Sequence, residues 1–513
     1  MTAPDERRMP TRTIDSTVRE RARNRPDDIA VIGLHQPLTW RQLDEAADRA
    51  ARVLAENGVG PGSLVGWFGA NDVGYPVVLL ATWRRRAGLV GVNWRLPDHD
   101  QRSLAQEISL THLVSGADLT DRAERIAEGL CGLTVVDQSA PLWPDIEPEP
   151  ETVLEPEPGD TAMVFFTSGS TGTPKSVPLT RRANELTVAN PNGHGIHAGT
   201  RQLIVPPVFH LAGAMWAQYG LLYGTTQVYI ADASPKGIVD ALNRYEITHA
   251  VFVPTLIRAV VDQLRAEPVA LPSFRHLAYG AAPITQSLIR EALEFLDCEF
   301  CQVFGMTEIG GTASFLRNEE HLNEGKPARL TSAGRPAPTV QLQVRDLATG
   351  EVLPTGASGG LWVRSPFMAQ GYIGRERETR AVFVDGWLNT RDVGHLDEDG
   401  FVYVEGRSDD MIVSGGENVH PGEIENAIAQ LPQVAECAVY GVLDERWGRK
   451  VCAAVVPRGP DLTEEAVIEH CRTVLAGYKV PKLVRMVPEL PRTANGKLIR
   501  KRLIAETAEE AAG

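Results

Sequence analysis

The sequence predicts an α/β protein: a large N-terminal body of layered α/β subdomains followed by a small α+β domain at the C-terminus. In the first part of the chain, short β-branched runs alternate with amphipathic helical patterns, which is typical of parallel strands connected by helices. After about residue 334, short strands separated by glycine-rich turns take over, and a compact mixture of helices and strands follows from about residue 423. We therefore expect two domains, 1–406 and 407–513.

The elements of the N-terminal body follow from apolar periodicity. Residues 41–58 repeat apolar side chains at three- and four-residue spacing and end at Gly58, which predicts an amphipathic helix with a glycine stop. The apolar segment from Tyr75 to Trp83 is too short to span a membrane and predicts a core element. Residues 141–160, rich in proline and acid, predict a solvated connection. Short strands are expected at 202–206, 226–230, 249–253 and 275–278.

The C-terminal domain shows its own alternation of patterns. Helical and strand patterns alternate within about a hundred residues, and a basic segment follows near the end of the chain. We expect a helix at 421–430, strands at 434–441 and 450–456, and a helix at 463–475.

Composition and charge narrow the class of protein. With 43% hydrophobic and 23% charged residues the chain is typical of a globular protein, so disorder is excluded. The 66 acidic residues exceed the 51 Lys and Arg and give a net charge of −15, which disfavours nucleic acid and anionic membrane surfaces as partners. No apolar stretch approaches the ~20 residues of a membrane span, and the N-terminus lacks the apolar core of a signal peptide. We expect a cytoplasmic enzyme, either monomer or homodimer.

The cysteines do not form an obvious framework. Six in 513 residues are too sparse for a disulfide scaffold. Cys298 and Cys301 have CxxC spacing, but a metal site of this kind needs a second pair or histidines at ligand spacing, and none follows along the chain. The sequence therefore predicts two half-buried thiols on a strand.

A loop of hydroxyls and glycines is the strongest local signal. Residues 161–175 form an apolar strand that runs into this loop and ends at Lys175. Glycines allow an anion to approach the backbone, hydroxyls donate hydrogen bonds, and a lysine adds charge. The loop differs from a Walker A loop because Pro174 stands before the lysine, and proline has no backbone N–H to donate. We expect a phosphate loop of another kind rather than a simple hairpin turn, with contacts from Thr167, Ser168, Gly169, Ser170, Thr171, Gly172 and Lys175.

Several further motifs follow this loop in a fixed order. The chain reads Y-G-A-A-P at 279–283, V-F-G-M-T-E at 303–308, W-L-N-T-R-D at 387–392, G-R-S-D-D-M-I-V-S-G-G-E-N at 406–418 and P-R-T-A-N-G-K at 491–497. Together with T-S-G-S-T-G-T-P-K, this series resembles the adenylate-forming superfamily of acyl-CoA synthetases, adenylation domains and luciferases. It is most similar to fatty-acyl and benzoate-type CoA ligases. The resemblance implies that the C-terminal domain is mobile.

The resemblance implies a reaction in which a carboxylate attacks the α-phosphorus of ATP, with Mg²⁺ and coenzyme A as the other cofactors. Lys497 matches the lysine that bridges the carboxylate and the α-phosphate, which are both anions and need a cation between them. Glu308 matches the magnesium ligand and Thr307 a donor to the α-phosphate; locally, Thr-Glu is also typical of a helix N-cap. Asp409 matches the hinge about which the small domain rotates between the two half-reactions.

The same resemblance assigns the nucleotide contacts. Phe304 would stack on adenine, Asp392 would accept the ribose hydroxyls, and Arg407 would lie near the ribose and phosphates. His210 matches a position beside the acyl pocket, although a lone histidine in an apolar segment is also typical of a core. The remaining positions expected around ATP are Gly280, Ala281, Ala282, Pro283 and Gly305.

Two residues depart from the superfamily pattern. Ser176 and Arg391 stand where glycine is usual, and Arg391 brings a bulky cation next to the nucleotide site. A serine costs little if its backbone angles are ordinary. The arginine is compatible with a phosphate contact, a solvent-facing side chain or an unusual substrate.

The acceptor of the activated acyl group is expected to bind to the C-terminal domain. An indole and a phenol can stack on the nucleotide of coenzyme A, and lysines can face its phosphates. The alternative for the tryptophan is a buried core anchor. The positions expected to contact coenzyme A are Gly415, Gly416, Trp447, Tyr478 and Lys479.

The sequence thus predicts an ATP-dependent ligase that joins a small aryl or fatty carboxylic acid to coenzyme A through an acyl-adenylate. Superfamily members that load a carrier protein, or that adenylate nitrite to diazotise an aryl amine, are the alternatives. A non-catalytic descendant of a ligase is disfavoured because Glu308 and Lys497 are both present.

Overall fold

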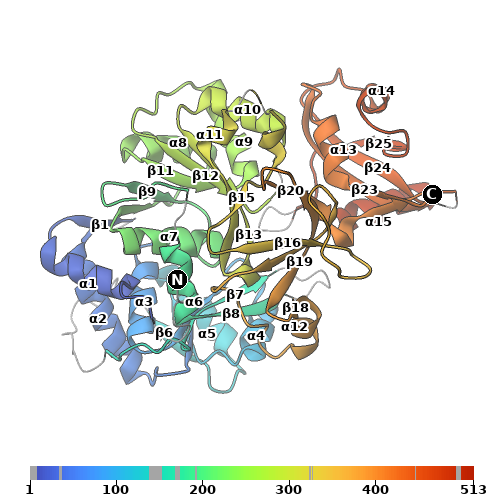
Figure 1. Cartoon of the computed structure of the whole chain (residues 1–513). Helices are drawn as coiled ribbons and strands as arrows, with labels where there is room; N and C mark the ends of the chain where they lie inside the picture. The colour runs from blue at the N-terminus through green and yellow to red at the C-terminus, as the bar shows by residue number, and fades with distance from the viewer. Residues whose placement is uncertain are drawn as a thin grey trace.

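A computed structural model describes residues 9–33, 37–137, 153–167, 174–190, 193–282, 284–322, 325, 327–444, 446–492 and 498–512. Within these residues the strands form four sheets, of nine, six, five and five strands (Figure 1). The first three lie in the N-terminal body and the last in the C-terminal domain, which stands to one side of the body in orange and red. The predicted α/β class, with a large body and a small C-terminal domain, is confirmed.

The nine-stranded sheet has the order β15-β14-β13-β12-β11-β9-β10-β1-β2. Its strands β9 to β13 and β1 are parallel, while β2, β14 and β15 pair antiparallel at its two edges. The four predicted strands are confirmed within three residues at each end. The strands are β1 (Ile29–Ile32), β2 (Leu38–Thr39), β9 (Arg201–Ile204), β10 (Thr226–Tyr229), β11 (His249–Phe252), β12 (His276–Gly280), β13 (Glu299–Met306), β14 (Gly311–Leu316) and β15 (Arg335–Pro336).

The six-stranded sheet has the order β6-β5-β3-β4-β7-β8. All neighbours are parallel except β7 and β8, which form a hairpin around the predicted phosphate loop. Its strands are β3 (Leu64–Phe68), β4 (Gly88–Gly91), β5 (His112–Ser115), β6 (Thr134–Asp137), β7 (Thr161–Thr167) and β8 (Lys175–Thr180).

Helices separate and cover these two sheets. The largest apolar core fills the space between them and includes helices α1 (Ile14–Asn24), α2 (Trp40–Glu56), α3 (Gly74–Arg84), α6 (Arg181–Ala189) and α7 (Leu211–Tyr223). A second core covers the outer face of the nine-stranded sheet, and a third covers that of the six-stranded sheet. The covering helices are α8 (Pro235–Arg244), α9 (Pro254–Ala266) and α10 (Gln286–Phe295) on the former, and α4 (Asp98–Glu107) and α5 (Thr120–Ala127) on the latter.

Two predictions about single helices are confirmed. The helix expected at 41–58 is α2, which begins with a capping box between Thr39 and Gln42; Gly58 has φ 85°, a conformation that favours glycine. The segment from Tyr75 to Trp83 lies in α3, every residue of which is buried. Of the connection expected at 141–160, the first twelve residues lie outside the described part of the chain.

The third sheet is antiparallel and accounts for the short strands expected after residue 334. The fourth sheet, in the C-terminal domain, confirms both predicted strands, which pair with each other as β23 and β24, and both predicted helices, α13 and α14. The elements are β16 (Gln341–Arg345), β17 (Gly359–Arg364), α12 (Glu376–Val382), β18 (Phe383–Val384), β19 (Trp387–Leu396), β20 (Val402–Arg407), β21 (Ile412–Ser414), β22 (Glu417–Val419), α13 (Pro421–Ile428), β23 (Val434–Asp444), β24 (Gly448–Pro457), α14 (Glu464–Val474), β25 (Leu483–Met486) and α15 (Arg500–Ala512).

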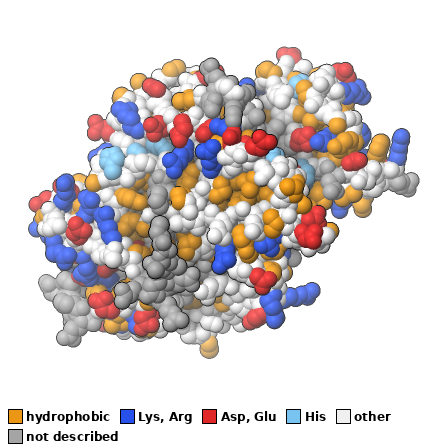
Figure 2. All heavy atoms as spheres, in the orientation of Figure 1, with side chains coloured by type: hydrophobic (Ala, Val, Ile, Leu, Met, Phe, Trp, Pro, Cys, Tyr) orange, Lys and Arg blue, Asp and Glu red, His pale blue; other side chains and the backbone are white. Residues whose placement is uncertain are grey.

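Acidic and basic side chains are interspersed on the face shown in Figure 2 rather than gathered into one basic band. Among the described residues, no helix has both the length and the apolar character needed to cross a bilayer. The exact boundary between residues 406 and 407 stays a prediction.

Candidate active site

Close backbone approaches mark the ends of β12 and β13. A Cβ on Gly280 would lie 2.2 Å from the carbonyl oxygen of Val303, and one on Gly305 would lie 2.1 Å from that of Gly311. Only glycine fits such contacts. Ala281, directly after β12, has φ 63°, a left-handed conformation that costs an alanine free energy and is typical of functional sites. The backbone at Gly280 and Ala281, where contacts with ATP are predicted, is therefore tightly constrained.

A buried carboxylate lies just beyond β13. Glu308 is in a 3₁₀ turn, Thr307–Ile309, and its side chain is buried. Its Oε1 accepts a 2.8 Å hydrogen bond from the hydroxyl of Tyr372. Burial, and then the Glu308 carboxylate, raise the pKa of Tyr372, so the phenol remains protonated and donates. Met306 occupies the N-cap position of the turn and makes no side-chain capping bond, so the N-cap interpretation of Thr-Glu is wrong.

The lysine of the predicted phosphate loop faces the same tyrosine. Lys175 begins β8, is buried, and places its Nζ 4.9 Å from the centre of the Tyr372 ring. Burial, and then the positive charge of Arg391, lower the pKa of Lys175. Tyr372 therefore connects the loop lysine to Glu308. Tyr372 was not predicted, because the region after residue 334 showed only short strands and glycine-rich turns in the sequence.

A second buried carboxylate lies on β19. Asp392 Oδ1 is 3.1 Å from Nη1 of Arg407, at the end of β20, and the Asp392 amide donates to Thr390 Oγ1 at 3.1 Å. Burial raises the pKa of the Asp392 carboxyl to about 6, against the opposing effect of Arg407. The structure thus brings together two residues that the sequence analysis assigned to the ribose.

Arg391 has the backbone conformation of a glycine. Its φ is 61°, and its amide donates to Asn389 Oδ1 at 2.9 Å. Its guanidinium Nη1 lies 3.7 Å from Oδ2 of Asp409, the predicted hinge residue. An arginine in this region stores about 1–3 kcal/mol of strain. The solvent-facing alternative is not supported, because the Arg391 side chain is only 30% exposed and its guanidinium faces the hinge carboxylate.

The other departure, Ser176, has ordinary backbone geometry, although its buried hydroxyl has no hydrogen-bond partner among the described residues. It lies in β8, where it pairs with Phe166 in extended conformation, and its carbonyl accepts the amide of Ile373 at 3.1 Å. No glycine is required there, as expected from ordinary backbone angles.

The residues expected to contact coenzyme A also lie together. The Gly415 amide donates to the Trp447 carbonyl at 2.9 Å, and a Cβ on Gly415, which has φ 61°, would lie 3.1 Å from the indole. Lys482 places Nζ 5.3 Å over the Trp447 ring and donates to the carbonyl of Gly477 at 3.0 Å, next to Tyr478. Trp447 is only half-buried, so the core-anchor alternative is not supported.

Lys479 and Gly416 complete this surface of the C-terminal domain. Lys479 forms an ion pair of 2.6 Å with Glu423, and Gly416 has φ 86° in the turn between β21 and β22. We call the residues Gly415, Gly416, Trp447, Tyr478, Lys479 and Lys482 the indole patch.

Some assignments lie outside the described residues or remain predictions. His210 is half-buried before α7, with its ring 4.6 Å from that of Phe209, and its role in an acyl pocket stays a prediction. Phe304 lies half-buried on β13 against the core, and its stacking on adenine is likewise untested by the geometry. The positions outside the described residues are Ser168, Gly169, Ser170, Thr171, Gly172, Pro283 and Lys497.

The charged side chains of the site suit magnesium and ATP, the two groups that the motifs imply there. Glu308 offers a buried carboxylate, and carboxylate oxygens are the hard ligands that magnesium prefers. Lys175 and Arg391 add positive charge beside it, which suits a polyphosphate.

Comparison with known proteins shows the family to which the chain belongs. Residues 18–373 match the AMP-binding enzyme family, and residues 423–497 match the AMP-binding enzyme C-terminal domain. The fatty acid–[acyl-carrier-protein] ligase ScoC of Streptomyces coeruleorubidus is 32% identical over 506 residues, 96% of this chain and 96% of that one. The 2-succinylbenzoate–CoA ligase of Geobacillus kaustophilus is 32% identical over 507 residues, 97% of this chain and 99% of that one.

Solved structures extend the similarity to the fold. The o-succinylbenzoate CoA synthetase MenE of Bacillus subtilis, in complex with the acyl-adenylate intermediate OSB-AMP, has a TM-score of 0.83 at 28% identity, covering 95% of this chain and 97% of that one. Its complex with ATP and a magnesium ion has a TM-score of 0.82 at 28% identity, covering 95% and 98%.

The layered body, the small C-terminal domain and these matches define an ATP-dependent enzyme of the adenylate-forming class. The chain belongs to the AMP-binding enzyme family. It is an AMP-forming acid–thiol ligase. The similar MenE structures hold an acyl-adenylate in one case and ATP with a magnesium ion in another.

Proposed function

We propose that the enzyme activates a small aryl or fatty carboxylic acid in the cluster formed by Lys175, Glu308, Tyr372, Arg391 and Asp392, and then transfers the acyl group to free coenzyme A at the indole patch. The observation that carries this proposal is the chain of contacts from Lys175 through Tyr372 to Glu308. It places a cation and a carboxylate at the same end of the two large sheets, where a polyphosphate and its magnesium ion need them.

Charge complementarity explains why these residues suit adenylation. The acid and ATP are both anions, so their meeting point requires positive charge that is already in position. Lys175 and Arg391 supply it from the body, and Lys497 would supply it from the C-terminal domain at the carboxylate itself. Magnesium bound at Glu308 would neutralise phosphate charge and help orient the nucleotide.

The nucleoside would be held by the remaining residues of the site. The ionised carboxylate of Asp392 would accept the ribose hydroxyls, and Arg407 keeps that carboxylate oriented through their 3.1 Å contact. Gly280 and Ala281 would let adenine approach the backbone, with Phe304 against its face. Thr307, the first residue of the 3₁₀ turn, would donate to the α-phosphate.

The acid and the reaction can be tested together by pyrophosphate release. Purified enzyme with ATP and magnesium should release pyrophosphate with at least one member of a panel of aryl and fatty acids, and added coenzyme A should lose its free thiol at the same rate. Nitrite plus aryl amines belongs in the panel. Release with nitrite alone, and with no acid, would overturn the ligase proposal in favour of diazotisation.

The acceptor is tested at the indole patch. Coenzyme A is a polyanion, and the protein has a net charge of −15, so its site requires local stacking and positive charge. We expect Trp447→Ala combined with Tyr478→Ala to raise the KM for coenzyme A by about tenfold or more and to leave the KM for ATP nearly unchanged, because each stacking contact contributes about 0.5–2 kcal/mol. Steady-state kinetics with each substrate varied in turn gives both constants.

Trp362→Ala is a matched control, since this indole lies in the body on β17 and also faces an arginine. It should leave the KM for coenzyme A unchanged. If a carrier protein consumes the adenylate and coenzyme A does not, the free-thiol proposal is wrong, an outcome that the similarity to ScoC makes worth testing.

We further infer that the enzyme acts in the cytoplasm, where ATP and coenzyme A are available. The six cysteines are free thiols, which is usual in a reducing compartment.

A further inference from the structure

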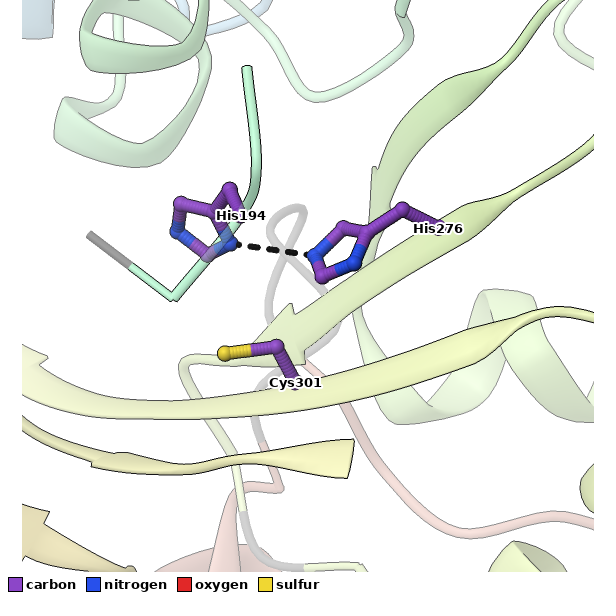
Figure 3. Close-up of side chains that lie close together, drawn as sticks. All are labelled: His194, His276 and Cys301. Atoms are coloured by element: carbon purple, nitrogen blue, oxygen red, sulfur yellow. Dashed lines mark hydrogen bonds between the residues drawn. The ribbon is translucent and has the colours of Figure 1, made fainter. Parts of the chain in front are cut away.

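Three buried side chains with metal-binding atoms meet on the face of the nine-stranded sheet that packs against α7. His194 lies between α6 and β9, His276 begins β12, and Cys301 is the third residue of β13. Their donor atoms lie within 4.8 Å of one another, and Nδ1 of His194 is 3.3 Å from Nε2 of His276 (Figure 3). The Cys301 side chain points to the same space beside the two rings. Each residue is nine-tenths buried or more.

This cluster is separate from the active site. His276 and Gly280 stand at opposite ends of β12, so four residues of extended strand, ~13 Å, separate the cluster from the adenine-binding segment. The cluster therefore lies at the amino ends of these parallel strands, and the proposed catalytic residues lie beyond their carboxyl ends.

The two histidines have the protonation state and spacing of metal ligands. Burial lowers the pKa of His194 to about 3 and also lowers that of His276, so both rings are neutral near pH 7. Neutral imidazole is the form that binds metals. Two Zn–N bonds of ~2.05 Å at a tetrahedral angle place their nitrogens ~3.4 Å apart, close to the 3.3 Å observed.

The surroundings supply an outer shell for such a site. Glu299, on the strand next to His276, places Oε2 3.9 Å from Nδ1 of that ring, too far for a hydrogen bond but near enough for its charge to favour a cation on the other ring nitrogen. His249 stacks on His276 with ring centres 5.3 Å apart. On the other side, Trp216, Tyr219 and Phe315 surround His194 with edge-on rings.

We propose that His194, His276 and Cys301 bind a zinc ion. Binding breaks the hydrogen bond between the two histidines, releases the Cys301 thiol proton to solvent and forms two Zn–N bonds and one Zn–S bond, with water as the fourth ligand. The ion and the thiolate together carry one positive charge, which the Glu299 carboxylate offsets. The ion would tie the segment around His194 to β12 and β13.

Metal content tests the proposal directly. Tag-free protein, produced with zinc and desalted, should contain about one zinc per chain by mass spectrometry. Cys301→Ser and His194→Gln should each lower that content at least tenfold. Cys471→Ser is the matched control, because Cys471 is equally buried but lies in α14 of the C-terminal domain, and it should retain the zinc.

The absorption spectrum of cobalt-loaded wild-type protein tests the site even if the variants fold poorly. Wild-type protein stripped of metal and loaded with Co²⁺ should show a thiolate-to-cobalt absorption band, absent in Cys301→Ser and present in Cys471→Ser. Folded wild-type protein that holds neither zinc nor cobalt would overturn the proposal and leave the three residues as a hydrogen-bonded core cluster. Adenylation activity is measured separately, so the ligase function and the zinc site can fail independently.

Discussion

Lys497→Ala should slow adenylate formation by about two orders of magnitude or more, equivalent to ~2.7 kcal/mol of transition-state stabilisation. The reason is that the lysine acts where the acid and the α-phosphate meet, both of them anions. Thioester formation from supplied acyl-adenylate should remain near the wild-type rate, since that step has no developing charge at this position. Pyrophosphate release measures the first half-reaction, and thiol consumption with synthetic acyl-adenylate measures the second.

Lys501→Ala is the control for the change of charge, because Lys501 lies in α15, four residues further along the same basic segment. It should leave both half-reactions nearly unchanged. Equal losses in the two half-reactions of Lys497→Ala would show that the residue has a structural role and that the assignment is wrong.

Glu308→Gln should lower adenylation by about 10²–10³-fold and raise the magnesium concentration needed for half-maximal rate. Glutamine has the same shape and can still accept the hydrogen bond of Tyr372, so the variant should fold normally while losing the charge that holds the metal. Magnesium titrations of initial rate, together with the melting temperature, separate these two effects.

Tyr372→Phe tests the same contact from its other side. It removes the hydroxyl that donates to Glu308 and keeps the ring that faces Lys175, so we expect a smaller loss than for Glu308→Gln. If Glu308→Gln retained the wild-type rate and magnesium dependence, the carboxylate would not be the metal ligand.

The sequence predicts regular elements well where local periodicity and a stop signal agree. The helix α2 is one example, since its capping box and Gly58 lie within the same short segment as its apolar stripe. The strands β23 and β24 were also expected, although each extends beyond its prediction because the pairing of the two strands continues past the apolar residues.

Contacts between distant segments could not be predicted in this way. Arg84 is the last residue of the apolar helix α3 and is buried among three carboxylates, Asp15, Asp44 and Asp48, which two other helices supply. The histidines beside Cys301 likewise come from a different strand and a different loop, so the absence of histidines at ligand spacing along the chain did not exclude them in space. Tyr372 was missed for the same reason: its partner Glu308 lies on another part of the fold.

The motifs predicted which residues form the candidate site. They did not predict which of these side chains contact each other or how deeply they are buried. The order of the motifs indicated Glu308, Asp392 and Arg407, but only the fold shows that Asp392 and Arg407 contact each other and that Glu308 is buried. The two departures from glycine were equally visible in the sequence. Only the structure shows that the backbone at Ser176 is extended, which any residue can adopt, whereas the backbone at Arg391 is left-handed, which favours glycine.

The proximity of Arg391 to Lys175 makes the nucleotide-free site electrostatically frustrated. The positive charge of Arg391 acts on Lys175, whose pKa is lowered first by burial and then by that charge, and Arg391 itself has strained backbone. A bound polyanion relieves that repulsion, so the nucleotide acts as a stabilising ligand of the native state as well as a substrate. The N-terminal body is therefore least stable when no nucleotide is bound. Relief of the repulsion between Lys175 and Arg391 contributes part of the free energy of ATP binding.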